Sequence, residues 1–227
     1  MQKENSPISV GIIIDGNRRW AGVRGQKPWE GHEAGYKKVK EVMVWLRDAG
    51  VKYVTAYTFS TENWKRPELE VTFLIKLIEH VLRSELDWAV AEGIRLVGVG
   101  DLSPFSPQIQ KLVHEAQEKT KDCSRITLCI ALNYGGRAEI INAVNEAVKI
   151  GKSVSEQEFS KLLYTKDIPD PDLIIRTSGE QRLSGFLPWQ SVYSELFFVK
   201  KFFPDLVKED IDEVLKEYAE RDRRQGK

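Results

Sequence analysis

The sequence predicts an α/β fold: a single domain built on a mostly parallel, six-stranded sheet flanked by helices. Short apolar runs alternate with longer segments of helical periodicity along the 227-residue chain. This alternation is typical of strand–helix–strand units, which pack helices on both faces of a parallel sheet. We find no internal repeat, low-complexity tract or long linker that would divide the chain. We therefore expect one domain over residues 1–227, with residues 1–7 as a flexible tail.

Six apolar runs rich in Val, Ile and Leu predict the strands. Strands that are buried on both faces read as nearly continuous apolar runs. The runs cover residues 8–14, 52–59, 94–99, 125–132, 172–176 and 195–199. The first run stops abruptly at Asp15, and both an ordinary polar turn and a phosphate site fit that junction.

Helical periodicity and capping residues predict the connecting elements. Gly50 is a natural end for a helix over 33–49, and Pro67 suits the first turn of a long helix over 67–91. Ser155 and Glu158 form a capping box for a short helix. The remaining helices are expected over 106–121, over 136–150 with one apolar face, and from about 208.

The predicted helix over 67–91 is apolar over an unusually wide arc. A helix that packs on one side needs only the i, i+3, i+4 stripe. The extra apolar residues therefore face a second apolar element, a partner chain or an apolar cavity. The residues of this arc are Val71, Phe73, Leu74, Ile75, Leu77, Ile78, Val81 and Leu82.

The charge balance argues against a long polyanionic partner. The 34 Lys and Arg equal the 34 Asp and Glu, so no overall basic field favours nucleic acid. Arginine nevertheless clusters locally, which suits a small anionic ligand. Cys123 and Cys129 fit no zinc spacing and indicate free thiols in a reducing compartment. With no signal core at the N-terminus and no run as long as a membrane span, we expect a cytoplasmic protein whose membrane contact is at most peripheral.

Polar segments follow four of the predicted strands. Because parallel strands bring their carboxyl ends to one edge of a sheet, these segments should lie together. Glycine lets the backbone approach a ligand closely, backbone amides can point at an anion, and arginine supplies positive charge. The residues at this edge therefore predict a phosphate-binding site. The segments are 15–20, 59–67, 133–137 and 176–184.

Missing motifs narrow the chemistry further. The chain has no P-loop, no Gly-x-Gly-x-x-Gly and no Gly-x-Ser-x-Gly motif. With no Asp-Asp-x-x-Asp cluster and three histidines, a single Mg²⁺ between carboxylate and phosphate oxygens is the simplest metal site. His32, at an expected helix start, fits either a phosphate contact or a surface cap. Trp64 fits either a ligand contact or a wedge that holds its loop against the core.

Four ordered motifs resemble the cis-prenyltransferases, the family of undecaprenyl diphosphate synthase. The resemblance runs from about residue 8 to Gly226. The motifs are Asp15-Gly-Asn-x-Arg-Trp, Phe59-Ser-Thr-Glu-Asn-Trp-x-Arg-Pro, Asn133-Tyr-Gly-Gly-Arg and Ile175-Arg-Thr-Ser-Gly-Glu-Gln-Arg-Leu-Ser-Gly-Phe. The resemblance implies a Mg²⁺-dependent transferase that extends an allylic diphosphate, such as farnesyl diphosphate, with isopentenyl diphosphate.

The resemblance also implies roles for individual residues. Asp15 would position Mg²⁺ and help to ionise the allylic diphosphate, and Asn63 would assist proton removal. Glu195 would contribute to the metal site from across a homodimer, which the Arg224-x-Gly226 element of the tail also reaches. The allylic diphosphate would be held by Gly16, Asn17, Arg18, Arg19, Trp20, His32 and Arg66. The reaction centre would include Ser60, Thr61, Glu62 and Trp64, and isopentenyl diphosphate would bind Arg176, Arg182, Leu183 and Ser184.

Three alternatives for the product and role follow. As an enzyme, the protein would make either a long polyprenyl diphosphate or a short- or medium-chain one. Alternatively, the protein would be a non-catalytic subunit of a heteromeric prenyltransferase. The last is disfavoured because Asp15, Asn17, Ser60 and Asn63 are all present. The chain departs from the family pattern at Arg18, where many bacterial members have glycine, and at Pro188. It departs again at Pro28, where an arginine is frequent, and we hypothesise that Arg18 takes its place.

Overall fold

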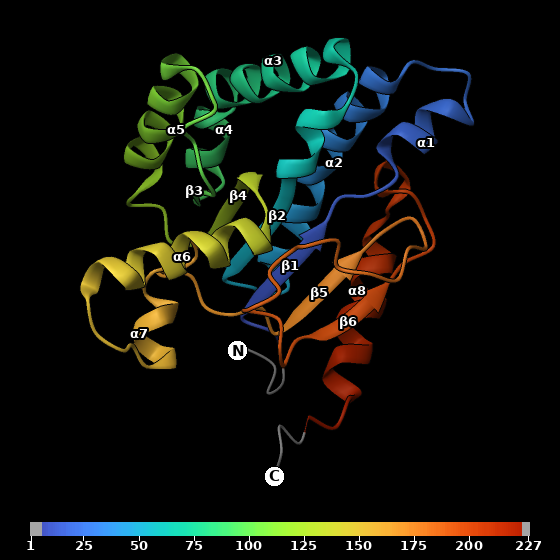
Figure 1. The fold of residues 1–227 in the computed structure, drawn as a ribbon. Coiled ribbons are helices and arrows are strands. Elements are labelled where there is room, and N and C mark those ends of the chain that lie inside the picture. Colours follow the sequence, from blue (N-terminus) through green and yellow to red (C-terminus); the bar gives the residue numbers. More distant parts are fainter. Residues whose placement is uncertain (1–5, 224–227) are drawn as a thin grey trace.

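A central sheet of parallel strands organises the molecule (Figure 1). The computed structural model describes residues 6–223. Within this range the sheet has six strands in the order β3-β4-β2-β1-β5-β6, and every neighbouring pair is parallel. The predicted fold class is therefore confirmed, with a sheet that is entirely parallel. The strands are β1 (Ser9–Ile13), β2 (Tyr53–Ser60), β3 (Ile94–Val99), β4 (Ile126–Tyr134), β5 (Leu173–Arg176) and β6 (Glu195–Phe198).

The helices cover both faces of this sheet (Figure 1). α2, α3, α4, α5 and α8 lie over one face, and α6 and α7 lie on the other side. The helices are α1 (Asn17–Gly22), α2 (Pro28–Asp48), α3 (Glu68–Ser84), α4 (Leu86–Ala91), α5 (Pro107–Thr120), α6 (Gly136–Ile150), α7 (Glu156–Ser160) and α8 (Lys208–Glu220). Two 3₁₀ helices, η1 (Thr61–Lys65) and η2 (Phe203–Asp205), complete the elements of the described chain.

Side chains that point alternately to the two faces of the sheet build a separate hydrophobic core on each face. On β4, Leu128 and Leu132 belong to the larger core, which α2–α5 and α8 cover. Cys129 and Ala131 point the other way, into a smaller core that includes Phe186. Successive side chains of a strand point to opposite faces, so one short strand supplies both cores.

The strand order places a topological switch beside β1. The chain passes from β1 to β2 on one side, whereas β5, much later in the sequence, pairs with the other side of β1. Ligands of open parallel sheets bind at the carboxyl ends of strands at such a switch. Asp15 directly follows β1, and Arg176 ends β5.

Two helices near the site differ from the prediction. α2 begins at Pro28, five residues before the expected start, so His32 lies inside its second turn and not at its first residue. The short α1, which begins at Asn17, was not predicted, because a helix of 6 residues is too short to show periodicity. Together these two helices place residues 17–19 and 32 around one opening.

The long helix that was expected over 67–91 is wrong as a single element. It divides at Glu85, whose φ of −104° and ψ of 3° depart from helical values, into α3 and α4. Directly before the break, the Ser84 hydroxyl donates a hydrogen bond of 2.8 Å to the His80 carbonyl oxygen, one turn earlier. Such back-bonding from serine bends helices. No proline or glycine marks the break, so the sequence pattern did not reveal it.

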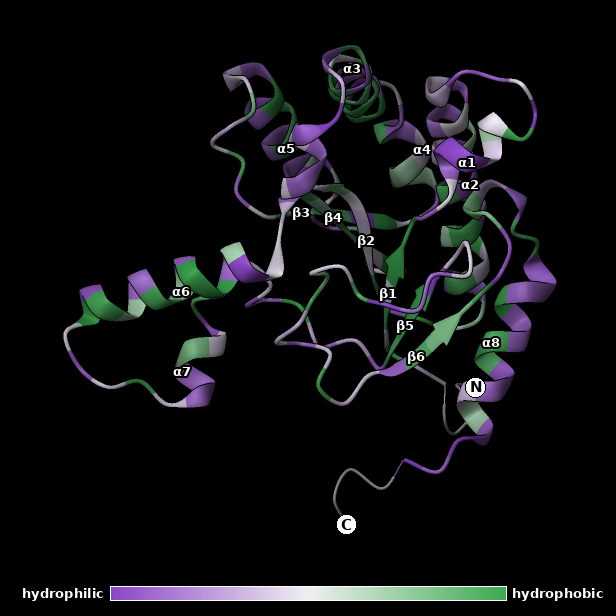
Figure 2. Cartoon of the chain, turned by 45° about the vertical axis from the view of Figure 1, so that its right-hand side comes forward, coloured by the Kyte–Doolittle hydropathy of each residue, from purple (hydrophilic) through white to green (hydrophobic). Residues whose placement is uncertain are grey.

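The apolar face of α6 does not pack as expected. Ile141, Val144 and Val148 are all exposed, although their spacing is that of a buried helical face. Figure 2 shows α6 projecting from the body of the molecule with hydrophobic residues along its length. Contiguous exposed apolar patches can mark interaction surfaces.

Candidate active site

Asp15 forms the centre of the polar edge of the sheet. Its Oδ2 atom lies 2.7 Å from Arg176 Nη2, and its Oδ1 atom lies 3.3 Å from Arg19 Nη2. The Thr177 hydroxyl donates a hydrogen bond of 2.7 Å to the Asp15 carbonyl oxygen, which fixes the backbone at the end of β1. A carboxylate is thus held between two guanidinium groups where β1 and β5 end.

Arg176 connects Asp15 to the segment after β5. Its side chain is buried, and its Nη1 atom donates a hydrogen bond of 2.9 Å to Ser184 Oγ and another to the Arg182 carbonyl oxygen. The buried guanidinium bonds a carboxylate, a hydroxyl and a carbonyl. It therefore holds together the end of β1, the end of β5 and the segment at 182–184. Ser184 itself has a φ of 51°, a left-handed conformation that is uncommon outside glycine.

Several buried polar atoms at this edge lack a partner within the described residues. They are Asn17 Oδ1, Arg176 Nε and Ser178 Oγ. Buried polar groups are almost always hydrogen-bonded in native proteins. An acceptor, a donor and a hydroxyl left unpaired next to Asp15 therefore fit a site that a polar ligand completes.

Glu70 gathers three cationic or basic side chains on the neighbouring side of the opening. Its Oε1 atom lies 3.0 Å from His32 Nε2 and 2.9 Å from Arg66 Nη1, and its Oε2 atom lies 3.6 Å from Arg18 Nε. Only 8% of the Glu70 side chain is exposed. Burial raises the pKa of Glu70, but the bond from His32 and the charges of Arg66 and Arg18 outweigh it and lower the pKa below its ordinary value. Burial also lowers the pKa of His32, so Glu70 stays charged and His32 neutral at pH 7.

The segment after β2 holds its asparagine by a local bond. Asn63 Oδ1 accepts a hydrogen bond of 3.1 Å from the Ser60 backbone N–H. Trp64 is instead held away from the opening, because its indole Nε1 donates 2.8 Å to Asn133 Oδ1 and its ring packs edge-on against Phe59. Of the two interpretations of Trp64, the wedge against the core is the one that these contacts support.

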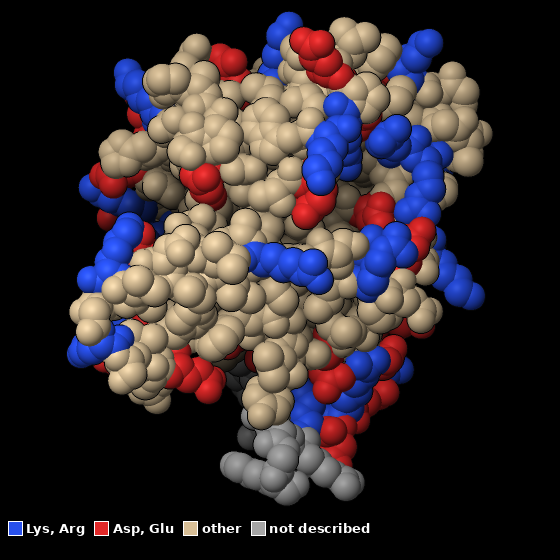
Figure 3. Space-filling view, in the orientation of Figure 1, with Lys and Arg blue, Asp and Glu red and all other residues tan. Residues whose placement is uncertain are grey.

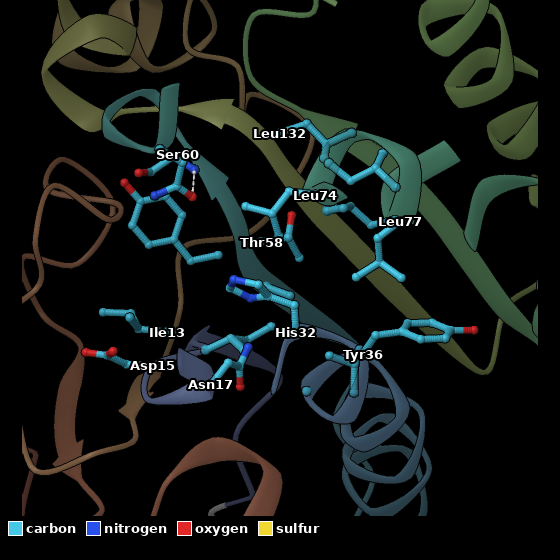
Figure 4. A pocket seen from close by; sticks show the side chains of 18 of the residues that line it. Ile13, Asp15, Asn17, His32, Tyr36, Thr58, Ser60, Leu74, Leu77 and Leu132 are labelled. Atoms are coloured by element: carbon cyan, nitrogen blue, oxygen red, sulfur yellow. Dashed lines mark hydrogen bonds between the residues drawn. The ribbon is translucent and has the colours of Figure 1, made fainter. Parts of the chain in front are cut away.

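One cavity joins this polar edge to the interior of the larger core face. Its volume is about 1190 Å³. Figure 4 shows Asp15 and Asn17 at one end and Tyr36 at the other, with His32 and Leu74 between them. Figure 3 shows Lys and Arg side chains along the edge of a recess in the surface.

The apolar part of this cavity, which we call the tunnel, lies between the sheet and α2–α4. It explains part of the wide apolar arc of α3: Leu77 and Val81 line the tunnel, whereas Val71 and Ile75 pack on the core. The tunnel is lined by Val39, Ala56, Leu74, Leu77, Ile78, Val81, Leu82, Trp88, Ala89, Leu96, Leu128, Ile130 and Leu132.

Most of the predicted site residues line this cavity. They are Asp15, Gly16, Asn17, Arg18, Arg19, His32, Ser60, Thr61, Glu62, Asn63, Arg66, Arg176 and Ser184. This list spans three of the four predicted polar segments, and Gly135–Arg137 of the remaining segment line the cavity too. The polar ends of the strands therefore share one opening.

Five predicted site residues lie outside the cavity lining. Trp20 donates a hydrogen bond of 2.6 Å to Asp205, and Trp64 is bound as described. Leu183 packs against the smaller core, and the Arg182 side chain pairs with Glu180. Glu195 begins β6, at the opposite edge of the sheet from Asp15, and pairs with Arg221 at 2.6 Å. The expected Arg224 and Gly226 contacts lie outside the described residues.

Sequence reasoning missed Glu70 as a site residue. Glu70 lies in the first turn of α3, where acidic residues are common, so its type and position alone did not mark it. The signal was present, because Arg66 and Glu70 are four residues apart at a helix start. Lys40 and Glu85, which also line the cavity, gave no comparable signal, since they meet only through tertiary packing.

The residues present fit a single Mg²⁺ held largely by substrate. Among residues 6–223 no group of three or more His, Cys, Asp or Glu gathers as a metal site. Mg²⁺ commonly binds through one carboxylate together with substrate phosphates and waters. Asp15 would supply the carboxylate, and Asn17 Oδ1, which is buried without a hydrogen-bond partner within the described residues, would offer a further acceptor.

Comparisons with known proteins identify the family. The family model described as putative undecaprenyl diphosphate synthase matches residues 13–226. An isoprenyl transferase of Clostridium perfringens is 46% identical over 99% of this chain and 91% of its own length. One from Thermotoga maritima is also 46% identical, over 97% of each chain.

Solved structures show the same fold. The lavandulyl diphosphate synthase of Lavandula x intermedia, in complex with dimethylallyl diphosphate, superposes with a TM-score of 0.93 at 33% identity, covering 99% of this chain and 100% of that one. A probable undecaprenyl diphosphate synthase of Campylobacter jejuni gives 0.84 at 30% identity, covering 98% and 100%. The fold and the cavity thus define an enzyme that transfers prenyl groups. The chain belongs to the undecaprenyl diphosphate synthase family of prenyltransferases.

Proposed function

We propose that this protein is a cis-prenyltransferase that joins isopentenyl diphosphate to an allylic diphosphate such as farnesyl diphosphate. The observation that carries this proposal is the single cavity, which connects the Asp15–Arg176 group to an apolar tunnel. An amphipathic substrate with a diphosphate head and a hydrocarbon tail needs both parts. The dimethylallyl diphosphate in the related lavandulyl enzyme is an allylic diphosphate of this kind.

In the proposed reaction the bond between C1 and oxygen of the allylic diphosphate breaks, and its electron pair leaves with the diphosphate. The double bond of isopentenyl diphosphate attacks C1, which forms the new carbon–carbon bond. Loss of a proton from C2 of the isopentenyl unit then restores a double bond. Arg18, Arg19 and Arg66 surround the leaving diphosphate and stabilise the charge that develops on it.

Mg²⁺ would be held by Asp15 together with substrate oxygens and would supply charge stabilisation to the leaving diphosphate. Arg176 orients the Asp15 carboxylate for that role through the contact of 2.7 Å between Arg176 Nη2 and Asp15 Oδ2. Ser184 and Arg176 would hold isopentenyl diphosphate. We place Arg182 and Leu183 in the same subsite through the backbone that Arg176 binds.

Asn63 orients the reaction centre in this proposal. A neutral amide is a poor base, and Asn63 Oδ1 already accepts the Ser60 N–H. We therefore assign the final proton acceptor to the diphosphate or to a water molecule. Ser60, Thr61 and Glu62 line the same part of the cavity.

The cavity is large enough to hold a hydrocarbon tail in addition to the polar head groups of the substrates. Pockets for drug-sized ligands have volumes of about 300–1,000 Å³, and this cavity has about 1190 Å³. A polyprenyl diphosphate that serves as a lipid-carrier precursor is the product that we propose. A short- or medium-chain product is the second candidate, in keeping with the likeness to the lavandulyl enzyme.

We further propose that the active unit is a homodimer. The exposed apolar stripe of α6 gives a second copy a surface to bury (Figure 2). Glu195 is remote from Asp15 in its own chain, so its metal role requires the partner's site. Among residues 6–223 we find no helix long and apolar enough to cross a membrane. We propose a cytoplasmic enzyme that contacts the membrane peripherally to release its product.

The test is incorporation of labelled isopentenyl diphosphate into extractable lipid by the purified protein with Mg²⁺ and C10, C15 or C20 primers. We expect product with the wild type, none when EDTA removes divalent metal, and almost none with D15A. If the wild type gives no product where a known synthase works, the catalytic proposal is wrong and a non-catalytic role takes its place.

A further inference from the structure

Asn133, near the end of β4, lies behind the reaction centre and is not among the residues that line the cavity. It begins the polar segment over 133–137, which the sequence placed at a phosphate site. Both ends of its amide are bonded within the chain: Oδ1 accepts a hydrogen bond of 2.8 Å from Trp64 Nε1, and Nδ2 donates one of 2.9 Å to the Asp101 carbonyl oxygen. The residue is buried. The Asn133 amide is therefore not available to a diphosphate, and its role is a different one.

These two bonds join three segments that meet at the carboxyl edge of the sheet. Asp101 follows β3, Asn133 belongs to β4, and Trp64 lies in η1, which follows β2. β4 lies between β3 and β2 in the sheet. Asp101 is itself held in a turn, because its Oδ1 atom accepts a hydrogen bond of 2.9 Å from the Ser103 backbone N–H. One amide thus anchors η1 to the ends of two strands.

The backbone at the end of β4 is shaped around the start of η1. Asn133 has a φ of 46°, a left-handed conformation that asparagine adopts more readily than most residues. The next residue, Tyr134, pairs with Ser60 after a shift in the register of β2 and β4. A Cβ atom on Gly135 would lie 2.5 Å from Thr61 Oγ1, so only glycine leaves room for η1 at that position.

η1 has one side toward the cavity and another toward Asn133. Ser60 and Asn63 line the cavity, whereas Trp64 packs its ring centroid 5.0 Å from that of Phe59 and 5.6 Å from that of Phe105. The bond between Asn63 and the Ser60 N–H is local and does not fix the segment against the sheet. Trp64 directly follows Asn63 in the chain, so a shift of the indole moves Asn63 as well.

We propose that Asn133 is a positioning residue, which fixes η1 and thereby holds Asn63 and Ser60 in place at the reaction centre. The proposal rests on the prenyl-transferring function above. Without the Asn133 amide, the Trp64 indole N–H loses its acceptor and η1 loses this polar link to β4 and β3. The allylic diphosphate cradle on α1 is separate from this link. Loss of the link should therefore slow the chemical step and leave primer binding intact.

The test measures the single-turnover rate constant for joining one isopentenyl unit to a labelled C15 primer, with enzyme in saturating excess. This rate constant does not depend on the fraction of enzyme that is folded. N133G removes the amide and suits the left-handed backbone. It should lower the rate constant about tenfold or more, since a misplacement of about 1 Å can cost about 10²-fold. KM for the allylic primer should stay the same.

A second variant approaches the same bond from the other side. W64F keeps an aromatic ring against Phe59 and removes the indole N–H, so it should slow the single-turnover step as N133G does. Because both substitutions delete one bond, N133G/W64F should be no slower than the slower single variant. W64F also assigns the Trp64 indole signal among those of the six tryptophans in a ¹H–¹⁵N spectrum. That N–H should exchange with solvent faster in N133G than in the wild type.

Q117A is the matched control. Gln117 is also an amide side chain that bonds a neighbouring segment, since its Oε1 atom accepts a hydrogen bond of 2.8 Å from the Gly98 backbone N–H, and neither residue lines the cavity. Q117A should lower the melting temperature and leave the single-turnover rate constant unchanged. It thereby separates a loss of stability from a loss of positioning.

The wild-type rate constant in W64F or in folded N133G overturns the positioning role and leaves the prenyl-transferring function intact. Losses that add in the double variant, or a loss confined to KM for the primer, overturn it too. Absence of product from the wild type overturns the proposed function instead.

Discussion

Arg176 Nη2 lies 2.7 Å from Asp15 Oδ2, although 161 positions separate the two residues in the chain. The contact exists because β5 pairs with β1 and brings both carboxyl ends to one edge. The carboxylate and its buried counter-charge are therefore placed by the sheet and need no ligand to bring them together.

Replacing Asp15 by asparagine should lower kcat about 10²–10³-fold, the usual cost of losing one preorganised electrostatic group. The amide cannot carry the charge that Mg²⁺ and Arg176 require. Steady-state rates of isopentenyl incorporation measure this loss. D212N is the control, since Asp212 pairs only with the exposed Lys208 on α8 and should keep the wild-type rate. A D15N enzyme with full activity would remove Asp15 from the site.

Arg18 should determine affinity for the allylic primer. Its guanidinium lies 3.6 Å from Glu70 at the opening. R18A should raise KM for the allylic diphosphate about tenfold, since a hydrogen bond to a charged group contributes about 1.5 kcal/mol. KM for isopentenyl diphosphate should stay the same.

R24A serves as the control for Arg18, because Arg24 pairs with Asp205 and stacks on Trp20 outside the cavity lining. An unchanged allylic KM in R18A would refute the idea that Arg18 replaces the arginine that Pro28 displaces.

The free energy of unfolding should decrease as pH falls, in one step that comes from His32 and a second that comes from Glu70. The pKa of His32 is lowered from 6.5 in the folded state, so the unfolded chain takes up that proton first and the unfolding free energy falls as pH drops below about 7. The pKa of Glu70 is lowered from 4.5, so its stabilising contribution is present above that value and is lost as pH falls through the folded pKa.

Melting temperatures between pH 8 and pH 4 test this dependence. H32Q keeps a donor for Glu70 but cannot titrate, so it should flatten the step near pH 6.5. H114Q changes an exposed histidine of α5 and should leave that step in place. A slope near pH 6.5 that is the same in H32Q and the wild type would show that His32 is not its source.

The sequence predicted the strands well because each is a short buried run with a polar end. It predicted the composition of the opening for the same reason: Asp15, Ser60 and Arg176 all follow such runs. It could not predict the break at Glu85, which depends on a serine side chain turning back to His80. Lys40 and Glu85 meet through the packing of α2 on α3, and neither position shows a local pattern.

The α6 helix shows a second limit of prediction from sequence, in which the pattern is clear but the partner is not. Its apolar spacing at Ile141, Val144 and Val148 predicted one apolar face, but not that its own chain leaves this face exposed. Periodicity reports that a face needs a partner and does not say which molecule supplies it.

Mixing two inactive variants should test the dimer and the role of Glu195 together. If Glu195 completes the partner's site, a D15A subunit paired with an E195A subunit has one intact site and one site that lacks both carboxylates. Random re-association should then restore up to about a quarter of wild-type activity. Each variant measured alone is the control, and no recovery after verified subunit exchange would contradict a shared site.

The most direct test of the central account is a crystal structure with a non-cleavable thiolo analogue of farnesyl diphosphate and Mg²⁺. The account predicts the diphosphate beside Asp15, Asn17 and Arg19, with the hydrocarbon running along Leu74 and Leu77 toward Lys40. A prenyl chain bound outside that tunnel, or a diphosphate away from Asp15, would contradict it.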